Sequence, residues 1–151
     1  MSGIYAKTFT VRWADLDPNG HMRHSAYADY GAQSRIAFLT EQGFGLTQFM
    51  KMRMGPILFA ENLKYLREVH FNENIQVSCE ATGLSPNRKH WRIRHRILRP
   101  DGELACLIDC QGAWLDLVQR KVVPDPTELE AVMQKMPRSE DFAEFTPEKP
   151  V

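Results

Sequence analysis

The chain has 151 residues, of which 43% are hydrophobic and 25% are charged. These values are typical of one globular domain and exclude a disordered or membrane-spanning chain. Equal numbers of basic and acidic side chains give a formal net charge of zero, so no overall field attracts the chain to nucleic acid or to an anionic membrane.

The cysteines and the amino terminus bear on the location of the protein. Cys79, Cys106 and Cys110 are odd in number and lie in apolar, strand-like segments, which predicts buried, reduced thiols. Residues 1–13 lack the apolar core of a signal peptide, and no later run approaches the ~20 apolar residues of a membrane-spanning helix. We therefore expect a soluble, cytoplasmic protein with no nucleic-acid or membrane partner.

The first elements are a strand, a turn and a long helix. Residues 4–15 alternate between polar and apolar side chains, which predicts a half-buried strand. Asp17-Pro18-Asn19-Gly20 then favours a type I turn. Residues 24–42 have the apolar spacing of a helix, which ends before Gly43. Many of its residues are small, so we expect a sheet to wrap closely around it.

Extended segments make up most of the rest of the chain. They span 56–68, 73–84, 89–98 and 103–117, and turn-forming residues separate them at hairpin spacing, which predicts an antiparallel meander. A short helix is expected over 126–135. We expect a single α+β domain over residues 1–136 and a loose tail over 137–151. Apolar residues on both faces of the last two strands predict a homo-oligomer.

Residues 11–27 contain the densest group of chemically active side chains. Asp15, Asp17, His21 and His24 lie between a strand end and a helix start, where unpaired backbone N–H groups carry partial positive charge. Such groups can polarise a carbonyl, and a carboxylate beside them can attack it or activate a water, so the arrangement favours acyl transfer. Two alternatives stay open: Asp17 as a purely structural turn residue, and Asp17, His21 and His24 as metal ligands.

The pattern Val-Arg-Trp-x-Asp-x-Asp-x-x-Gly-His-Met-x-x-x-x-Tyr over residues 11–27 resembles the hotdog-fold acyl-CoA thioesterases of the 4-hydroxybenzoyl-CoA thioesterase type. Residues 61–69 look like the second strand of that group, and the resemblance covers about residues 5–125. It implies a five-stranded antiparallel sheet wrapped around a long central helix, in a homodimer or tetramer with the active site at the subunit interface.

The resemblance also assigns roles to individual residues. It implies Asp17 as nucleophile or general base, assisted by His24, and backbone N–H groups near His24 and Ser25 that polarise the thioester carbonyl. The chain departs from the family in two places. Many relatives have His-Val-Asn-Asn where residues 21–24 are His-Met-Arg-His, and many have glutamate near Ala32 and Gln33. With that glutamate missing, Asp17 carries more of the chemistry.

Substrate contacts are expected from basic and aromatic side chains. Residues 88–96, an expected strand, form the most basic segment of the sequence. We therefore expect Arg88, Lys89 and Arg92 to bind the phosphates of coenzyme A. Tyr27 is also expected to contact the substrate. Glu61, expected to be partly buried, and His21 are reserve catalytic candidates.

The sequence therefore predicts an acyl-CoA thioesterase that releases a free acid and coenzyme A without a metal or redox cofactor. Two rivals keep the same scaffold: a non-catalytic acyl-binding domain and a dehydratase.

Overall fold

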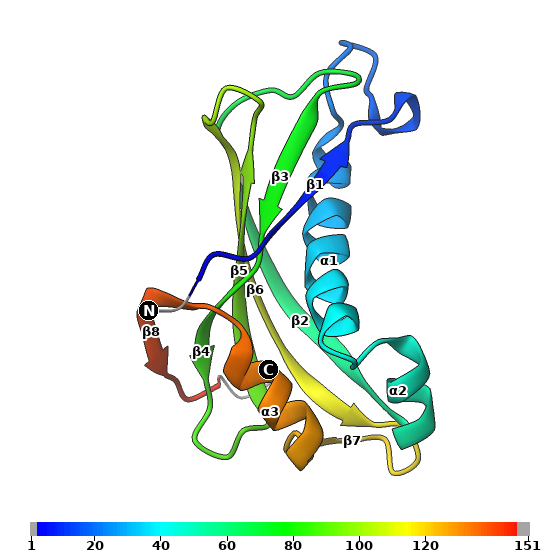
Figure 1. The fold of residues 1–151 in the computed structure, drawn as a ribbon, viewed down its shortest axis with the longest axis vertical. Helices are drawn as coiled ribbons and strands as arrows, with labels where there is room; N and C mark the ends of the chain where they lie inside the picture. Colours follow the sequence, from blue (N-terminus) through cyan, green and yellow to red (C-terminus); the bar gives the residue numbers. More distant parts are fainter. Residues whose placement is uncertain (1–2, 148–151) are drawn as a thin grey trace.

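The computed structural model describes residues 3–147, in which one curved sheet covers a long helix (Figure 1). The helices are α1 (His24–Glu41), α2 (Leu46–Met52) and α3 (Thr127–Lys135), with a 3₁₀ turn, η1, at Trp13–Asp15. The strands are β1 (Ala6–Thr10), β2 (Met54–Tyr65), β3 (Asn74–Ser78), β4 (Glu80–Leu84), β5 (His90–Leu98), β6 (Leu104–Asp116), β7 (Lys121–Val123) and β8 (Arg138–Glu144). This is the predicted α+β hotdog arrangement, with α1 along one face of the sheet, but the described sheet has eight strands, one pair of them parallel, instead of the predicted five antiparallel strands.

The predicted antiparallel meander is confirmed for three of its four segments, because β5 pairs with both β3 and β4, and β6 pairs with β5. β3 continues to β1. The prediction was wrong at β2, which pairs with β6 rather than with β3. The connection 66–73 carries the chain across the sheet instead of reversing it beside β2. The expected strand at 73–84 is also interrupted at Cys79.

The carboxyl-terminal segment corrects a second prediction. Residues 138–144, expected to belong to a loose tail, form β8, which pairs in parallel with β4. This strand forms because packing around Phe145 stabilises it more than the prolines and acidic residues of the segment favour disorder. A Cβ added at Gly83 would lie 2.9 Å from the ring of Phe145, and the Arg92 guanidinium stacks 3.9 Å from the same ring. Residues 148–151 of the expected tail lie outside the described residues.

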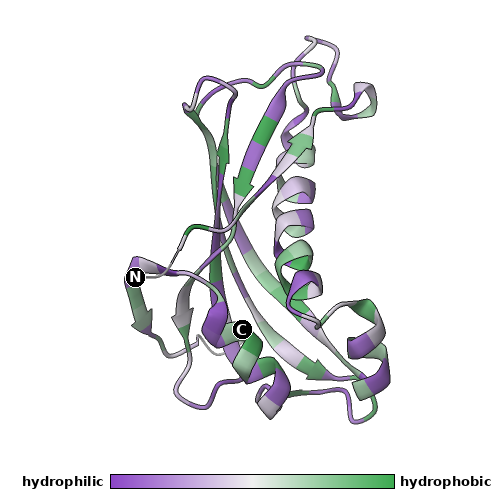
Figure 2. Cartoon of the chain, viewed as in Figure 1, coloured by the Kyte–Doolittle hydropathy of each residue, from purple (hydrophilic) through white to green (hydrophobic). Residues whose placement is uncertain are grey.

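Small residues let α1 approach the sheet closely, as predicted. A Cβ added at Gly31 would lie 3.1 Å from the side chain of Ile108, tighter than ordinary contact. The hydroxyl of Ser34 donates to the carbonyl of Val77 at 2.9 Å, so a small polar side chain also joins helix and sheet. Figure 2 shows the alternation of hydrophilic and hydrophobic residues along β3, whose buried residues face α1.

One polar pair is buried between α1 and the sheet. His95 is 0% exposed and its Nδ1 lies 2.8 Å from the carbonyl of Ser78, which assigns the proton to Nδ1. Nε2 then accepts a hydrogen bond from Arg35 at 3.0 Å. Burial, reinforced by the charge of Arg35, lowers the pKa of His95 to about 4. The imidazole is therefore neutral at pH 7.

The three cysteines are buried, as their apolar surroundings predicted. Cys79, Cys106 and Cys110 are buried and unpaired with one another, and burial raises the pKa of each thiol to about 12. None of the helices in residues 3–147 combines the length and apolar composition that a membrane crossing requires.

Candidate active site

Asp15, the first carboxylate of the motif, is a buried anchor for the loop after β1. It is 2% exposed and receives hydrogen bonds from the Arg12 guanidinium at 2.8 Å, from the Arg12 N–H at 3.1 Å and from the Tyr30 hydroxyl. Burial alone would raise the pKa of Asp15, but the hydrogen bonds from Arg12 and Tyr30 outweigh burial and lower the pKa to about 2. Asp15 therefore positions the loop and is not available for chemistry.

Asp17, the second carboxylate, is held by the turn that the sequence predicted. Its Oδ1 accepts the N–H groups of Asn19 at 2.9 Å and His21 at 3.2 Å, and Gly20 has the positive φ of 81° that the turn requires. Among the residues that the structure describes, no hydrogen bond reaches Oδ2. One oxygen thus fixes the side chain while the second remains available to a ligand.

The cleft that holds Asp17 combines three segments of the chain. It has a volume of about 360 Å³ and takes residues from the loop, from the start of α1 and from the end of β2. Its lining comprises Asp17, His21, Met22, His24, Tyr27, Tyr65, Leu66, Arg67 and Glu68. The structure therefore brings together four residues singled out from the sequence, Asp17, His21, His24 and Tyr27.

Two tyrosines, Tyr27 and Tyr65, form part of the wall of this cleft. The Tyr65 hydroxyl donates to the carbonyl of His24 at 3.2 Å, and the Tyr27 hydroxyl donates to the carbonyl of Arg67 at 3.3 Å. Their rings meet edge to face with centroids 5.3 Å apart. Burial raises the pKa of Tyr27 to about 12, so its hydroxyl remains a donor at physiological pH. These contacts tie the end of β2 to the start of α1.

The start of α1 is open toward a ligand. No side chain caps this 18-residue helix, and its first turn contains no acidic residue. The N–H of Ala26 bonds to the carbonyl of Arg23 at 3.0 Å, whereas no acceptor for the N–H groups of His24 and Ser25 is found within residues 3–147. His24 lines the Asp17 cleft, and Ser25 follows it at the exposed end of the helix. The first residue of α1, at the positive end of the helix, and Asp17 therefore line the same cleft.

Sequence reasoning missed the residues that β2 and its following loop contribute. Tyr65, Arg67 and Glu68 fall within residues 61–69, the segment that resembled a family strand, but no spacing rule marks which of them reach Asp17. Their proximity depends on the position of β2 relative to α1. Glu61 was expected to be partly buried, and this is wrong for the described chain: it is exposed, because β2 is an edge strand.

The proposed phosphate-binding residues lie away from Asp17. Arg88 and Lys89 occupy the β4–β5 turn, at the opposite end of the sheet from the Asp17 loop (Figure 1). Arg88 forms a two-fold hydrogen-bonded ion pair with Asp125, both contacts being 2.9 Å. Arg92 donates to Gln111 at 3.3 Å. Arg88 thus anchors the segment before α3, while Lys89 has no ion pair among the described residues.

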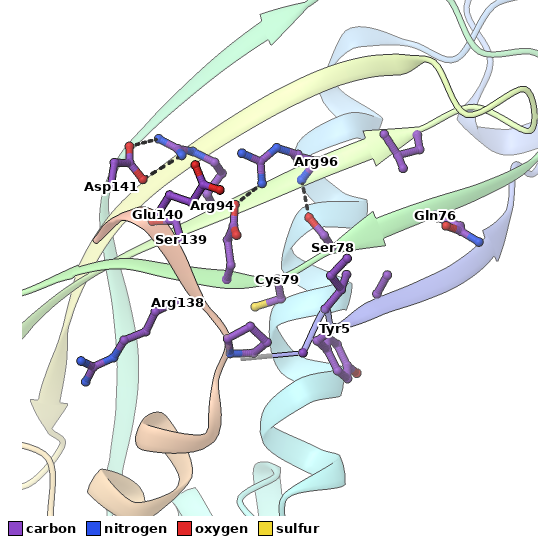
Figure 3. A pocket seen from close by; sticks show the side chains of 16 residues that line it. Tyr5, Gln76, Ser78, Cys79, Arg94, Arg96, Arg138, Ser139, Glu140 and Asp141 are labelled. Carbon is purple, nitrogen blue, oxygen red and sulfur yellow. Dashed lines mark hydrogen bonds and ion pairs between the residues drawn. The ribbon is translucent and has the colours of Figure 1, made fainter. Parts of the chain in front are cut away.

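Two arginines on the outer face of β5, Arg94 and Arg96, are neutralised by acids. Figure 3 shows them at the edge of a hollow of about 820 Å³, where Arg94 pairs with Asp141 at 3.2 Å and Arg96 pairs with Glu80. Arg94 also contacts Asp109 at 2.8 Å. This hollow is larger than the Asp17 cleft, but Arg94 and Arg96 are already paired with acids there, and burial raises the pKa of the thiol of Cys79, which also lines it.

Residues 11–135 match the family model of the thioesterase-like superfamily. No curated protein sequence matches the chain. Among solved structures, a hypothetical protein from Staphylococcus aureus in complex with CoA has a TM-score of 0.80 and 17% identity, over 99% of this chain and 98% of that one. A 1,4-dihydroxy-2-naphthoyl-CoA thioesterase from Synechocystis has a TM-score of 0.78 and 14% identity, over 87% and 96%.

Proposed function

The chain belongs to the thioesterase-like superfamily, and we propose that it hydrolyses an acyl-CoA thioester to a carboxylic acid and coenzyme A. The observation that carries the proposal is one cleft holding both the Asp17 carboxylate and the uncapped start of α1. The names of similar structures, which include a gentisyl-coenzyme A thioesterase, support the same substrate class.

The thioester carbonyl would bind at the start of α1. Its oxygen accepts the free N–H groups of His24 and Ser25, where the partial positive charge of the helix stabilises the negative charge that develops during attack. Tyr27 and Tyr65 form an aromatic wall beside the acyl group. The backbone groups are already oriented by the helix, so little reorganisation is needed.

Asp17 would supply the nucleophile or the base. As a base, its Oδ2 takes a proton from water, the oxygen of that water bonds to the carbonyl carbon, the C–S bond breaks, and the coenzyme A thiolate takes up the proton. As a nucleophile, Oδ2 itself bonds to the carbonyl carbon, and the C–S bond breaks to release the coenzyme A thiolate. Water then cleaves the resulting anhydride to the carboxylic acid, which regenerates the Asp17 carboxylate, and the proton released is taken up by the thiolate. Intact-mass spectrometry of a rapidly quenched reaction distinguishes the two, because only the second adds the acyl mass to the chain.

The decisive variant is Asp17→Asn, which keeps the size of the side chain and its turn hydrogen bonds. We expect free-thiol release from acyl-CoA esters to fall about 10²- to 10⁴-fold, the range for a positioned acid or base, with an unchanged far-UV spectrum. A dehydratase or a non-catalytic acyl-binding domain would release no thiol at all.

Asp101→Asn is a matched control for the turn. Asp101 occupies the β5–β6 turn and accepts the N–H of Glu103 at 3.0 Å, as Asp17 accepts that of Asn19. This variant should retain wild-type turnover. If Asp17→Asn also turned over at the wild-type rate, Asp17 would have only a structural role.

The active unit is proposed to be a homodimer or tetramer. β2 pairs with β6 along one side only, and its exposed side chains include Leu58 and Phe59, at 41% and 52% exposure. A long apolar edge strand invites pairing with a second copy. The end of β2 also lines the Asp17 cleft, so pairing there would place the catalytic residues at the subunit interface.

In such an oligomer, cationic side chains near the subunit interface would bind the phosphates of coenzyme A. Lys89 is the stronger candidate in its turn, because the charge of Arg88 is balanced by the buried Asp125. Arg92 remains a second candidate, because the alternation of β5 places it on the same sheet face as Arg94 and Arg96.

A further inference from the structure

Two histidines and a glutamate form a cluster at the rim of the Asp17 cleft. Donor atoms of His21, Glu68 and His70 all lie within 4.8 Å of one another. Within the described chain no ion pair or hydrogen bond joins these three side chains, so their donor atoms are not engaged with one another. His21 and Glu68 line the cleft, whereas His70 lies outside its lining.

The main chain holds the two histidines opposite each other. His21 and His70 form an isolated antiparallel bridge, and the N–H of Met22 donates to the carbonyl of Val69 at 2.7 Å. The two imidazole rings meet edge to face, with centroids 5.0 Å apart. Residues far apart in sequence are thus placed together by backbone pairing, which is rigid compared with the surface side chains around it.

We propose that His21, Glu68 and His70 bind one divalent transition-metal ion of the zinc class. Two imidazole nitrogens and one carboxylate oxygen suit Zn²⁺ and Co²⁺, with water completing the coordination. Tetrahedral ligands about 2.1 Å from an ion lie about 3.4 Å apart, so the donors must move together by roughly an ångström. Glu68 and His70 are exposed, and rotation of their side chains allows this movement.

The ion would lie against the site of the proposed hydrolysis. The N–H of His21 donates to Oδ1 of Asp17, and its side chain lines the same cleft. The ligand set differs from Asp17, His21 and His24, the set that the sequence left open. It draws on the loop after β2, which no motif spacing connects to His21.

The test is direct binding to the full, untagged chain after treatment with a chelator. Titration with Co²⁺ should give the visible absorption of a low-symmetry Co²⁺ site and saturate at one ion per chain. Zn²⁺ should displace that spectrum, and calorimetry should report the same stoichiometry. Because binding is measured without substrate, the result is independent of thioesterase activity.

Variants assign the ligands. His70→Ala and Glu68→Gln should each weaken Zn²⁺ binding at least about 10-fold, since even partners outside the coordination shell have effects of this size. His24→Ala and Glu103→Gln, which remove a neighbouring histidine and a surface carboxylate, should leave binding unchanged. His70 is exposed, and a far-UV spectrum confirms that the variant folds.

Two results would overturn the proposal. One is the absence of saturable Co²⁺ or Zn²⁺ binding to the wild-type chain. The other is an ion bound equally well by His70→Ala, or one lost in His24→Ala, because either would place the ligands elsewhere.

Discussion

Protonation of the buried His95 should make the stability of the fold depend on pH below neutrality. Its pKa is about 4 in the folded chain against 6.5 for an unperturbed histidine, because it is buried and faces Arg35. Between these two values the unfolded chain binds a proton that the folded chain does not. Stability from a neutral His95 is therefore complete above pH 6.5 and is lost as the pH falls toward 4.

The size of the effect follows from the two pKa values. Between pH 7.5 and pH 4.5 the linkage amounts to about 2.5 kcal/mol of lost unfolding free energy. That is a large fraction of the roughly 5 to 15 kcal/mol that stabilises a typical domain. The value is also measurable, because urea unfolding can be followed by the fluorescence of the buried Trp91 and Trp114.

The control is His95→Gln, whose amide can still donate to Ser78 and accept from Arg35 but does not titrate. We expect the wild-type chain to lose about 2.5 kcal/mol more than this variant over the same pH interval. Comparing the two slopes removes the contribution of every other titrating group. Parallel curves for the two proteins would refute the assignment of a neutral, buried His95.

Three further predictions concern packing, assembly and substrate. Gly112→Ala should destabilise the fold by at least about 3 kcal/mol in urea unfolding, because its Cβ would lie 2.3 Å from the carbonyl of Ile57; Gly55→Ala, with no atom within 4 Å, should be nearly neutral. Phe59→Lys should lower the mass measured by light scattering, and an unchanged mass would exclude pairing through β2. Lys89→Ala should raise KM several-fold for acyl-CoA but not for acyl-pantetheine; equal changes would exclude a phosphate contact.

Local chemistry made the elements around the candidate site predictable from sequence. The Asp17 turn, the start of α1 at His24 and the small residues on that helix are set by backbone preferences within a few residues. The same segment carries the family motif, so it also indicated the class of chemistry. Its two carboxylates have different roles, however, and only their burial separates the anchored Asp15 from the available Asp17.

Pairing over long distances was not predictable in the same way. Turn residues mark where a strand ends but not which strand lies beside it, so the meander was expected where β2 pairs with β6. β8 was missed because prolines and acids suggested disorder, while its stability comes from hydrogen bonds to β4 and from packing of Phe145.

Sequence by itself determined the long helix, most of the strand segments and the carboxylate turn, since these depend on neighbours along the chain. Tertiary structure alone decided that Tyr65, Arg67 and Glu68 line the same cleft as Asp17, and that His70 lies opposite His21. Such contacts join segments separated by about 50 residues, and their geometry is fixed by how the sheet folds around α1 rather than by any local preference.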